Sequence, residues 1–92
     1  MTPDEVRMLV YRRAGGRCHV CKTRVPWPGQ LAHKIPQSKV MMKKYGRAVI
    51  HHPLNMELVC GLYCNDRVSI SNHPVAIAEL VTKIRRELEN KS

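Results

Sequence analysis

The sequence predicts a small α+β domain with a helix at each end and two short strands between them. Apolar residues recur at helical spacing from about Pro74 to Asn90, which indicates a long amphipathic helix. Short apolar runs at 30–35 and 56–59, bounded by proline and glycine, are typical of strands. Because the chain has 92 residues, we expect residues 1–92 to form a single domain.

The first helix is predicted from its capping residues. Thr2 can cap it, Pro3 suits the first helical position, and Glu5 completes a capping box. The pair Gly15-Gly16 is expected to end the helix. Its apolar face is predicted to consist of Val6, Leu9 and Val10.

Two further helices follow from weaker patterns, and the last helix has the clearest one. We expect a short helix within 37–53 and another over residues 64 to about 70, with Asn72 or His73 as the cap of the last helix. One side of the helix within 37–53 would carry Val40, Met41, Tyr45 and Val49. The core-facing side of the last helix would carry Ile77, Leu80, Val81, Ile84 and Leu88.

The charge of the chain favours a polyanionic partner. Lysine and arginine number 16 against 7 acidic residues, a formal net charge of +9, and nucleic acid is the most plausible partner of such a surface. A well-solvated surface explains the same charge equally well. No apolar run approaches the roughly 20 residues that cross a bilayer, and the start of the chain lacks the apolar core of a secretory leader. We therefore expect a cytoplasmic protein without a membrane partner.

Four cysteines occur as two close pairs, Cys18-x2-Cys21 and Cys60-x3-Cys64. Each pair can place two thiolates about one zinc ion, and two pairs complete its tetrahedral shell. Two disulfides are disfavoured in a reducing cytosol, and a redox CxxC normally accompanies a βαβ unit, which is not visible here. Four protein ligands leave no open position, so this zinc is expected to hold the fold and to perform no chemistry.

The residues with the best potential for chemistry lie between and just after these pairs. His33 lies in the otherwise apolar run Leu31-Ala32-His33-Lys34-Ile35-Pro36. Asn55 directly precedes the second strand, and Asn65 directly follows the last cysteine. Taken singly, a histidine or an asparagine is common on surfaces and in turns. Their order relative to the four cysteines is what favours a site.

These motifs resemble the HNH endonucleases, whose core is a ββα-metal fold. The resemblance covers residues 18 to about 70: the strand with His33, the run Asn55-Met56-Glu57-Leu58-Val59-Cys60, and Cys60-Gly61-Leu62-Tyr63-Cys64-Asn65. It implies that His33 is the general base, that Asn55 orients it and that Asn65 binds a catalytic metal. The chain is also similar to small phage and prophage members, which implies phage packaging proteins as possible partners.

One position departs from the family. Members usually carry Asp or His directly before the base as a metal ligand, and this chain has Ala32. The missing ligand could be replaced by water, a DNA phosphate oxygen, Asp66, or an imidazole of His51 or His52. His52 is our preferred choice, because it lies just ahead of the second strand. The ion would be Mg²⁺, Mn²⁺ or Ni²⁺.

Phosphodiester hydrolysis gives these residue types a purpose. A histidine near its ordinary pKa of about 6.5 can accept the proton of a water at neutral pH, and a divalent cation can neutralise the phosphate. The expected phosphate contacts are Lys34, Lys39, Lys43, Lys44, Arg47 and Arg67. The predicted function is a DNA endonuclease or nickase. The alternative is a zinc-stabilised nucleic-acid-binding module without catalysis.

Overall fold

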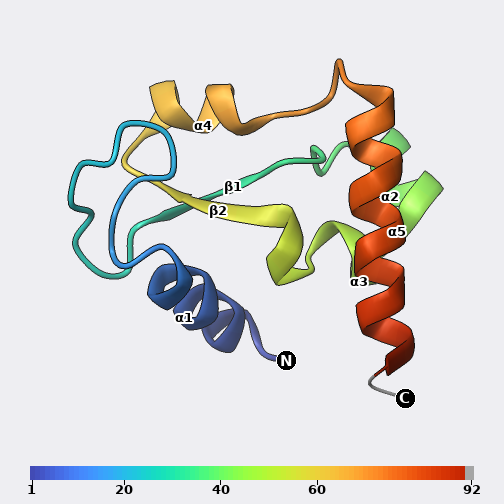
Figure 1. The fold of residues 1–92 in the computed structure, drawn as a ribbon, viewed down its shortest axis with the longest axis horizontal. Helices are drawn as coiled ribbons and strands as arrows, with labels where there is room; N and C mark the ends of the chain where they lie inside the picture. The colour runs from blue at the N-terminus through green and yellow to red at the C-terminus, as the bar shows by residue number, and fades with distance from the viewer. Residues whose placement is uncertain (91–92) are drawn as a thin grey trace.

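The computed structural model describes residues 1–90 and combines helices with a small antiparallel sheet, which confirms the α+β class (Figure 1). The elements follow in the order α1 (Pro3–Arg13), β1 (Gln30–His33), α2 (Lys39–Tyr45), α3 (Arg47–Ile50), the 3-10 helix η1 (Pro53–Asn55), β2 (Met56–Val59), α4 (Leu62–Val68) and α5 (Pro74–Asn90). The bounds of β2 and α5 are those that the sequence predicted.

The sheet consists of β1 and β2, which pair antiparallel with Gln30 opposite Val59 and His33 opposite Met56. Helices α1 and α4 lie on opposite sides of these strands (Figure 1). Side chains alternate between the two faces of a strand, so Ala32 and His33 point to different sides. The first strand ends at His33 and not at Ile35 as predicted, because the backbone of Ile35 bonds to a side chain and leaves the ladder.

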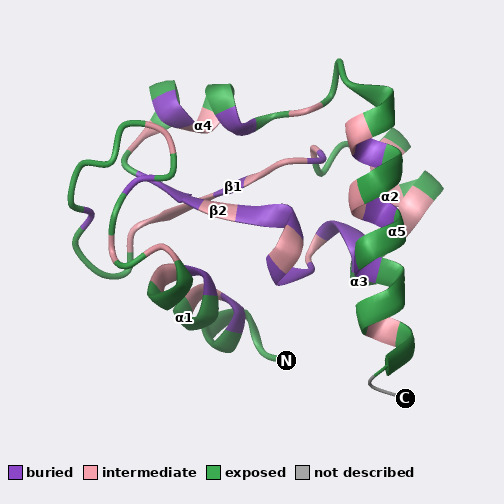
Figure 2. Ribbon diagram, in the orientation of Figure 1, coloured by how far each residue is buried: buried purple, intermediate pink, exposed green. Residues whose placement is uncertain are grey.

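The buried side chains form two clusters, one around the sheet and one where α3 packs against α5 (Figure 2). The first joins α1, the sheet, the cysteine loops and α4 through Val6, Val10, Cys18, Val25, Ala32, Met56, Leu58, Val59, Cys64 and Val68. The second joins α3 and α5 through Ile35, Val49, Ile50, Ile77, Val81 and Ile84. Ala32 belongs to the first cluster and Ile35 to the second, so His33 lies where the two meet.

Helix α1 begins as predicted, with the side chains and backbone of Thr2 and Glu5 bonded reciprocally in a capping box. Its apolar face is narrower than predicted. Val6 and Val10 are buried, whereas Leu9 is 40% exposed. A sheet of only two strands offers a narrow surface, which accommodates the i and i+4 positions of the helix and not the one beside them.

The helix expected within 37–53 is two helices, α2 and α3, separated by Gly46. Gly46 has a φ of 86°, a left-handed conformation that ends α2 and turns the chain into α3. The prediction that Val40 belongs to the apolar side is wrong, since Val40 is 71% exposed. Met42 instead packs on the second cluster together with Met41 and Tyr45. The last helix, α5, starts at Pro74, so His73 is the residue directly before its first turn.

No helix within residues 1–90 is both long enough and apolar enough to span a bilayer.

Candidate functional site

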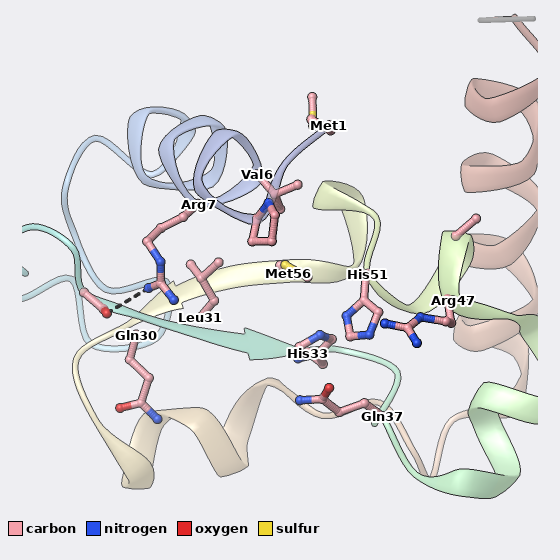
Figure 3. A pocket seen from close by; sticks show the side chains of 13 residues that line it. Met1, Val6, Arg7, Gln30, Leu31, His33, Gln37, Arg47, His51 and Met56 are labelled. Atoms are coloured by element: carbon pink, nitrogen blue, oxygen red, sulfur yellow. Dashed lines mark hydrogen bonds between the residues drawn. The ribbon is translucent and has the colours of Figure 1, made fainter.

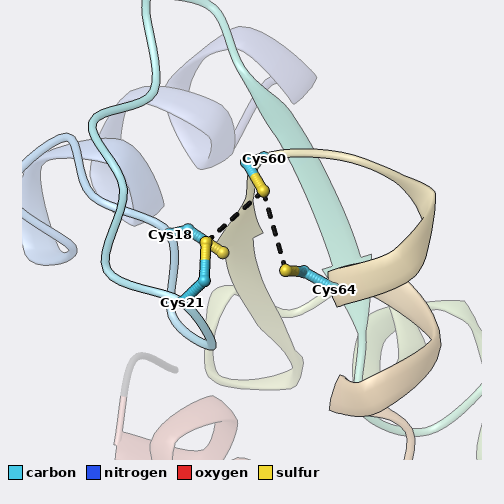
Figure 4. A group of neighbouring side chains, drawn as sticks. All are labelled: Cys18, Cys21, Cys60 and Cys64. Carbon is cyan, nitrogen blue, oxygen red and sulfur yellow. Dashed lines mark hydrogen bonds between the residues drawn. The ribbon is translucent and has the colours of Figure 1, made fainter.

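The four cysteines come together, as predicted, at one corner of the molecule (Figure 4). Their Sγ atoms all lie within 4.8 Å of one another, and Cys60 Sγ is 3.6 Å from both Cys21 Sγ and Cys64 Sγ. A disulfide bond would require about 2.05 Å. Four sulfur atoms at about 2.3 Å from one ion lie about 3.8 Å apart in a tetrahedron. The arrangement is therefore one that could hold a metal.

The surroundings of the sulfurs favour a bound cation. Burial raises the pKa of Cys18, but backbone N–H groups of Cys21, Val20 and Cys60 lower it to about 6. Burial and the neighbouring thiols raise the pKa of Cys64 to about 12. Four sulfurs so close together cannot all ionise without a positive charge between them, and a divalent ion supplies it.

A second site lies on the opposite side of the sheet from α4, where a cavity of about 750 Å³ opens beside β1 (Figure 3). It is bordered by α1, by α3 and by β1. Its lining contains no aspartate or glutamate. Its polar side chains are Arg7, Gln30, His33, Gln37, Arg47 and His51.

His33 is the half-buried histidine of this cavity. Among residues 1–90, its Nε2 is the one buried side-chain nitrogen or oxygen without a hydrogen-bond partner. Its ring packs edge-on against His51, with ring centres 5.5 Å apart and planes at 80°. Burial, and then the charge of His51, lower the pKa of His33 below its ordinary 6.5. At neutral pH His33 is therefore uncharged and able to accept a proton.

Asn55 is fully buried. Its Oδ1 accepts from the backbone N–H of Ile35 at 2.8 Å, and its Nδ2 donates to the carbonyls of Ile35 at 3.1 Å and Ile50 at 2.8 Å. The chain segments that carry His33 and His51 are thus tied to one amide. The predicted influence of Asn55 on His33 would act through the backbone.

The structure does not bring the two predicted ligands of a catalytic metal into this cavity. Asn65 lies on α4, on the other side of the sheet, and His52 is buried with its Nδ1 accepting from the N–H of Leu54 at 3.1 Å. The histidine that joins His33 is His51, not the preferred His52. The sequence indicated only that one of the adjacent residues His51 and His52 could lie near His33. The turn between α3 and η1 decides which of the two faces β1.

A ready-made cluster for a catalytic ion is also absent from the described part of the chain. Within residues 1–90 the four cysteines are the one group of three or more His, Cys, Asp or Glu residues placed to hold an ion. Ala32 is 1% exposed and packs in the first apolar cluster. An ion beside His33 would need ligands from outside the chain.

The predicted phosphate contacts fall into three environments. Lys34 Nζ pairs with a Glu57 carboxylate oxygen at 3.1 Å, and Arg67 donates to the Tyr63 hydroxyl at 2.7 Å. Arg47 lines the cavity. The exposed lysines of α2 are Lys39, Lys43 and Lys44. Arg47 therefore lines the same cavity as His33, and the α2 lysines are exposed to solvent.

Comparisons of this chain with known protein families, with curated proteins and with solved structures find no match. The relationship to HNH nucleases accordingly stays a prediction from the residues.

Proposed function

We propose that this protein is a metal-dependent DNA endonuclease or nickase of the HNH type. The single observation that carries the proposal is His33: a neutral, half-buried imidazole at the edge of a cavity whose lining holds arginines and no carboxylate. A general base must be unprotonated at working pH, and a phosphodiester needs positive charge around it. His33 would take the proton of the attacking water.

The chain itself offers few ligands for the catalytic metal of this reaction. A divalent cation, Mg²⁺, Mn²⁺ or Ni²⁺, would supply charge neutralisation of the phosphate when bound. Asn65 and His52, its predicted ligands, do not line the cavity, and the lining offers no carboxylate. Phosphate oxygens of the DNA and water would therefore have to provide most of its ligands.

A structural zinc at the four cysteines completes the proposal. The cysteines belong to the loop after α1, the end of β2 and the first turn of α4, so one ion would clip three segments together. A domain of this size buries a modest core, and such a clip supplies stability that the core lacks.

The runner-up is a zinc-stabilised nucleic-acid-binding module without catalysis. Its support is the buried Ala32 and the lack of a second metal cluster in residues 1–90. Plasmid nicking in Mg²⁺, Mn²⁺, Ni²⁺ or EDTA separates the two functions. We expect metal-dependent nicking that His33→Ala lowers by about 10²–10⁴-fold.

The matched control is His73→Ala, which removes an exposed histidine that does not line the cavity. It should nick DNA at the wild-type rate. Equal rates for wild type and His33→Ala would overturn the assignment of the base. Absence of nicking by the wild type in every metal, with DNA binding retained, would favour the binding module.

A further inference from the structure

Two arginines border His33 from opposite sides of the cavity. Figure 3 shows Arg7 of α1 on one side, His33 with His51 in the middle, and Arg47 of α3 on the other. The charge runs of the sequence single out Arg47, whereas Arg7 is one of several arginines around the first helix. Only the docking of α1 against the sheet brings Arg7 to the same cavity.

Arg7 is held in place before any ligand arrives. Its Nη1 donates to the carbonyl of Gly29 at 3.1 Å and to that of Pro28 at 3.5 Å, and its side chain is partly buried. A guanidinium has five N–H donors, so the remaining ones are available to an anion. A side chain ordered in advance loses little freedom on binding, which favours affinity.

Neither arginine is neutralised within the chain. Among residues 1–90, no carboxylate forms an ion pair with Arg7 or Arg47, and none lines the cavity. Guanidinium groups match phosphate geometry and bind it through paired N–H donors. The ligand chemistry that this cavity favours is therefore a phosphate-bearing anion that extends past His33 in both directions.

We infer that Arg7 and Arg47 hold the phosphates on either side of the phosphodiester that faces His33. The ligand is then a DNA backbone with several consecutive phosphates, and an isolated phosphodiester fills only the centre of the cavity. The cutting of that backbone rests on the proposed function, whereas the binding does not need catalysis.

Binding is tested with fluorescein-labelled duplex DNA by anisotropy over a salt series. Arg7→Gln and Arg47→Gln should each weaken binding and lower the slope of log K against log salt by about 1, as expected for one lost phosphate contact. Arg12→Gln is the control: it removes the same charge from α1, at an exposed position that does not line the cavity, and should keep the wild-type slope. If Arg7→Gln and Arg47→Gln both show the same slope of log K against log salt as Arg12→Gln, the inference is wrong.

Cleavage provides the second arm, with bis(p-nitrophenyl) phosphate as a diester that lacks flanking phosphates. Both arginine variants should lose about tenfold more plasmid nicking than hydrolysis of this small diester, since one lost phosphate contact worth about 1.4 kcal/mol corresponds to a factor of ten. Equal losses on both substrates would overturn the flanking role. Within residues 1–90 Arg47 is hydrogen-bonded through its backbone carbonyl, which accepts from His51, and not through its side chain. Arg47→Gln therefore keeps the test valid even if Arg7→Gln disturbs the fold.

The two proposals fail in different ways. If the wild type cuts no DNA but the arginine variants show the lower slope of log K against log salt, the nuclease is refuted and the phosphate contacts stand. Active wild-type protein with unaffected arginine variants would refute the contacts and keep the nuclease.

Discussion

The side-chain amide of Asn55 bonds to both backbone polar groups of Ile35, as a neighbouring strand would. Its Oδ1 receives the N–H of Ile35 at 2.8 Å, and its Nδ2 donates to the carbonyl of Ile35 at 3.1 Å. The same Nδ2 reaches the carbonyl of Ile50 at 2.8 Å. One buried side chain therefore joins the segment after β1 to the end of α3, and with them the two histidines of the cavity.

Asn55→Ala should destabilise the fold by on the order of 3 kcal/mol. The substitution leaves one N–H and two carbonyls without partners in a fully buried place, and each unsatisfied buried group costs about 1–3 kcal/mol. Urea unfolding measures the change. Asn72→Ala, at an exposed position, is the control and should change stability by about 0.5 kcal/mol or less. Equal stability of the two variants would mean that the three bonds of Asn55 are not formed.

Removal of zinc should unfold the protein. The four cysteines clip three segments of a domain with a small core, so folding and metal binding are expected to be coupled. Purified protein should contain zinc, chelation should abolish the folded circular dichroism signal, and added zinc should restore it. Cys60→Ser should show a lowered melting temperature. A folded, stable protein that contains no metal would contradict this expectation.

The acid side of the pH–rate profile should have its midpoint below pH 6.5. The working form of His33 is neutral, and burial followed by the charge of His51 lowers its pKa from the ordinary 6.5. Nicking rates over a pH series measure this midpoint. His51→Ala removes the smaller cause, so its profile should move part of the way toward 6.5; a profile centred above 6.5 in the wild type would be inconsistent with a buried base.

The lowered pKa of His33 should also make the stability of the fold depend on pH. The unfolded chain holds its proton on His33 to higher pH than the folded protein does, so it binds more protons between the two pKa values. Stability should therefore rise as the pH increases toward 6.5 and fall as it decreases through the lowered pKa. His33→Ala should reduce this pH dependence in urea unfolding, whereas His73→Ala should leave it unchanged.

Ala32→Asp should not supply the metal ligand that HNH nucleases carry before the base. Ala32 is 1% exposed, packs in the first apolar cluster and points to the other side of β1 from His33. A buried carboxylate without a cation is destabilising, so we expect a lowered melting temperature that Mg²⁺ does not restore, and no gain of nicking in Mg²⁺. Ala32→Asn is the matched uncharged control. A melting temperature of Ala32→Asp that rises with Mg²⁺ would show that residue 32 reaches an ion.

At equal concentration, Mn²⁺ or Ni²⁺ should support more nicking by the wild type than Mg²⁺ does. The cavity offers imidazoles and no carboxylate, and these ions accept nitrogen ligands more readily and stand higher in the affinity order. Initial rates of plasmid nicking in each chloride salt test the expectation. The reverse order would indicate an all-oxygen shell away from His33.

The sequence alone predicted the elements whose signals are local. The capping box of Thr2 and Glu5, the strand at 56–59 and the helix from Pro74 to Asn90 each depend on neighbouring residues, and all three are present. The clustering of the four cysteines was equally predictable, because short spacings bring each pair together and one ion's shell needs both pairs.

Only the tertiary structure decided which residues share the cavity. That His51 and not His52 meets His33, and that Arg7 and Arg47 line the same cavity, depends on how α1 and α3 dock on the sheet. Likewise, the side chain of Asn55 bonds to the backbone of Ile35, which is 20 positions away in the sequence, and to that of Ile50, which is 5 positions away. Capping and periodicity are set within a few residues, whereas contacts between distant segments follow from the packing of the whole core.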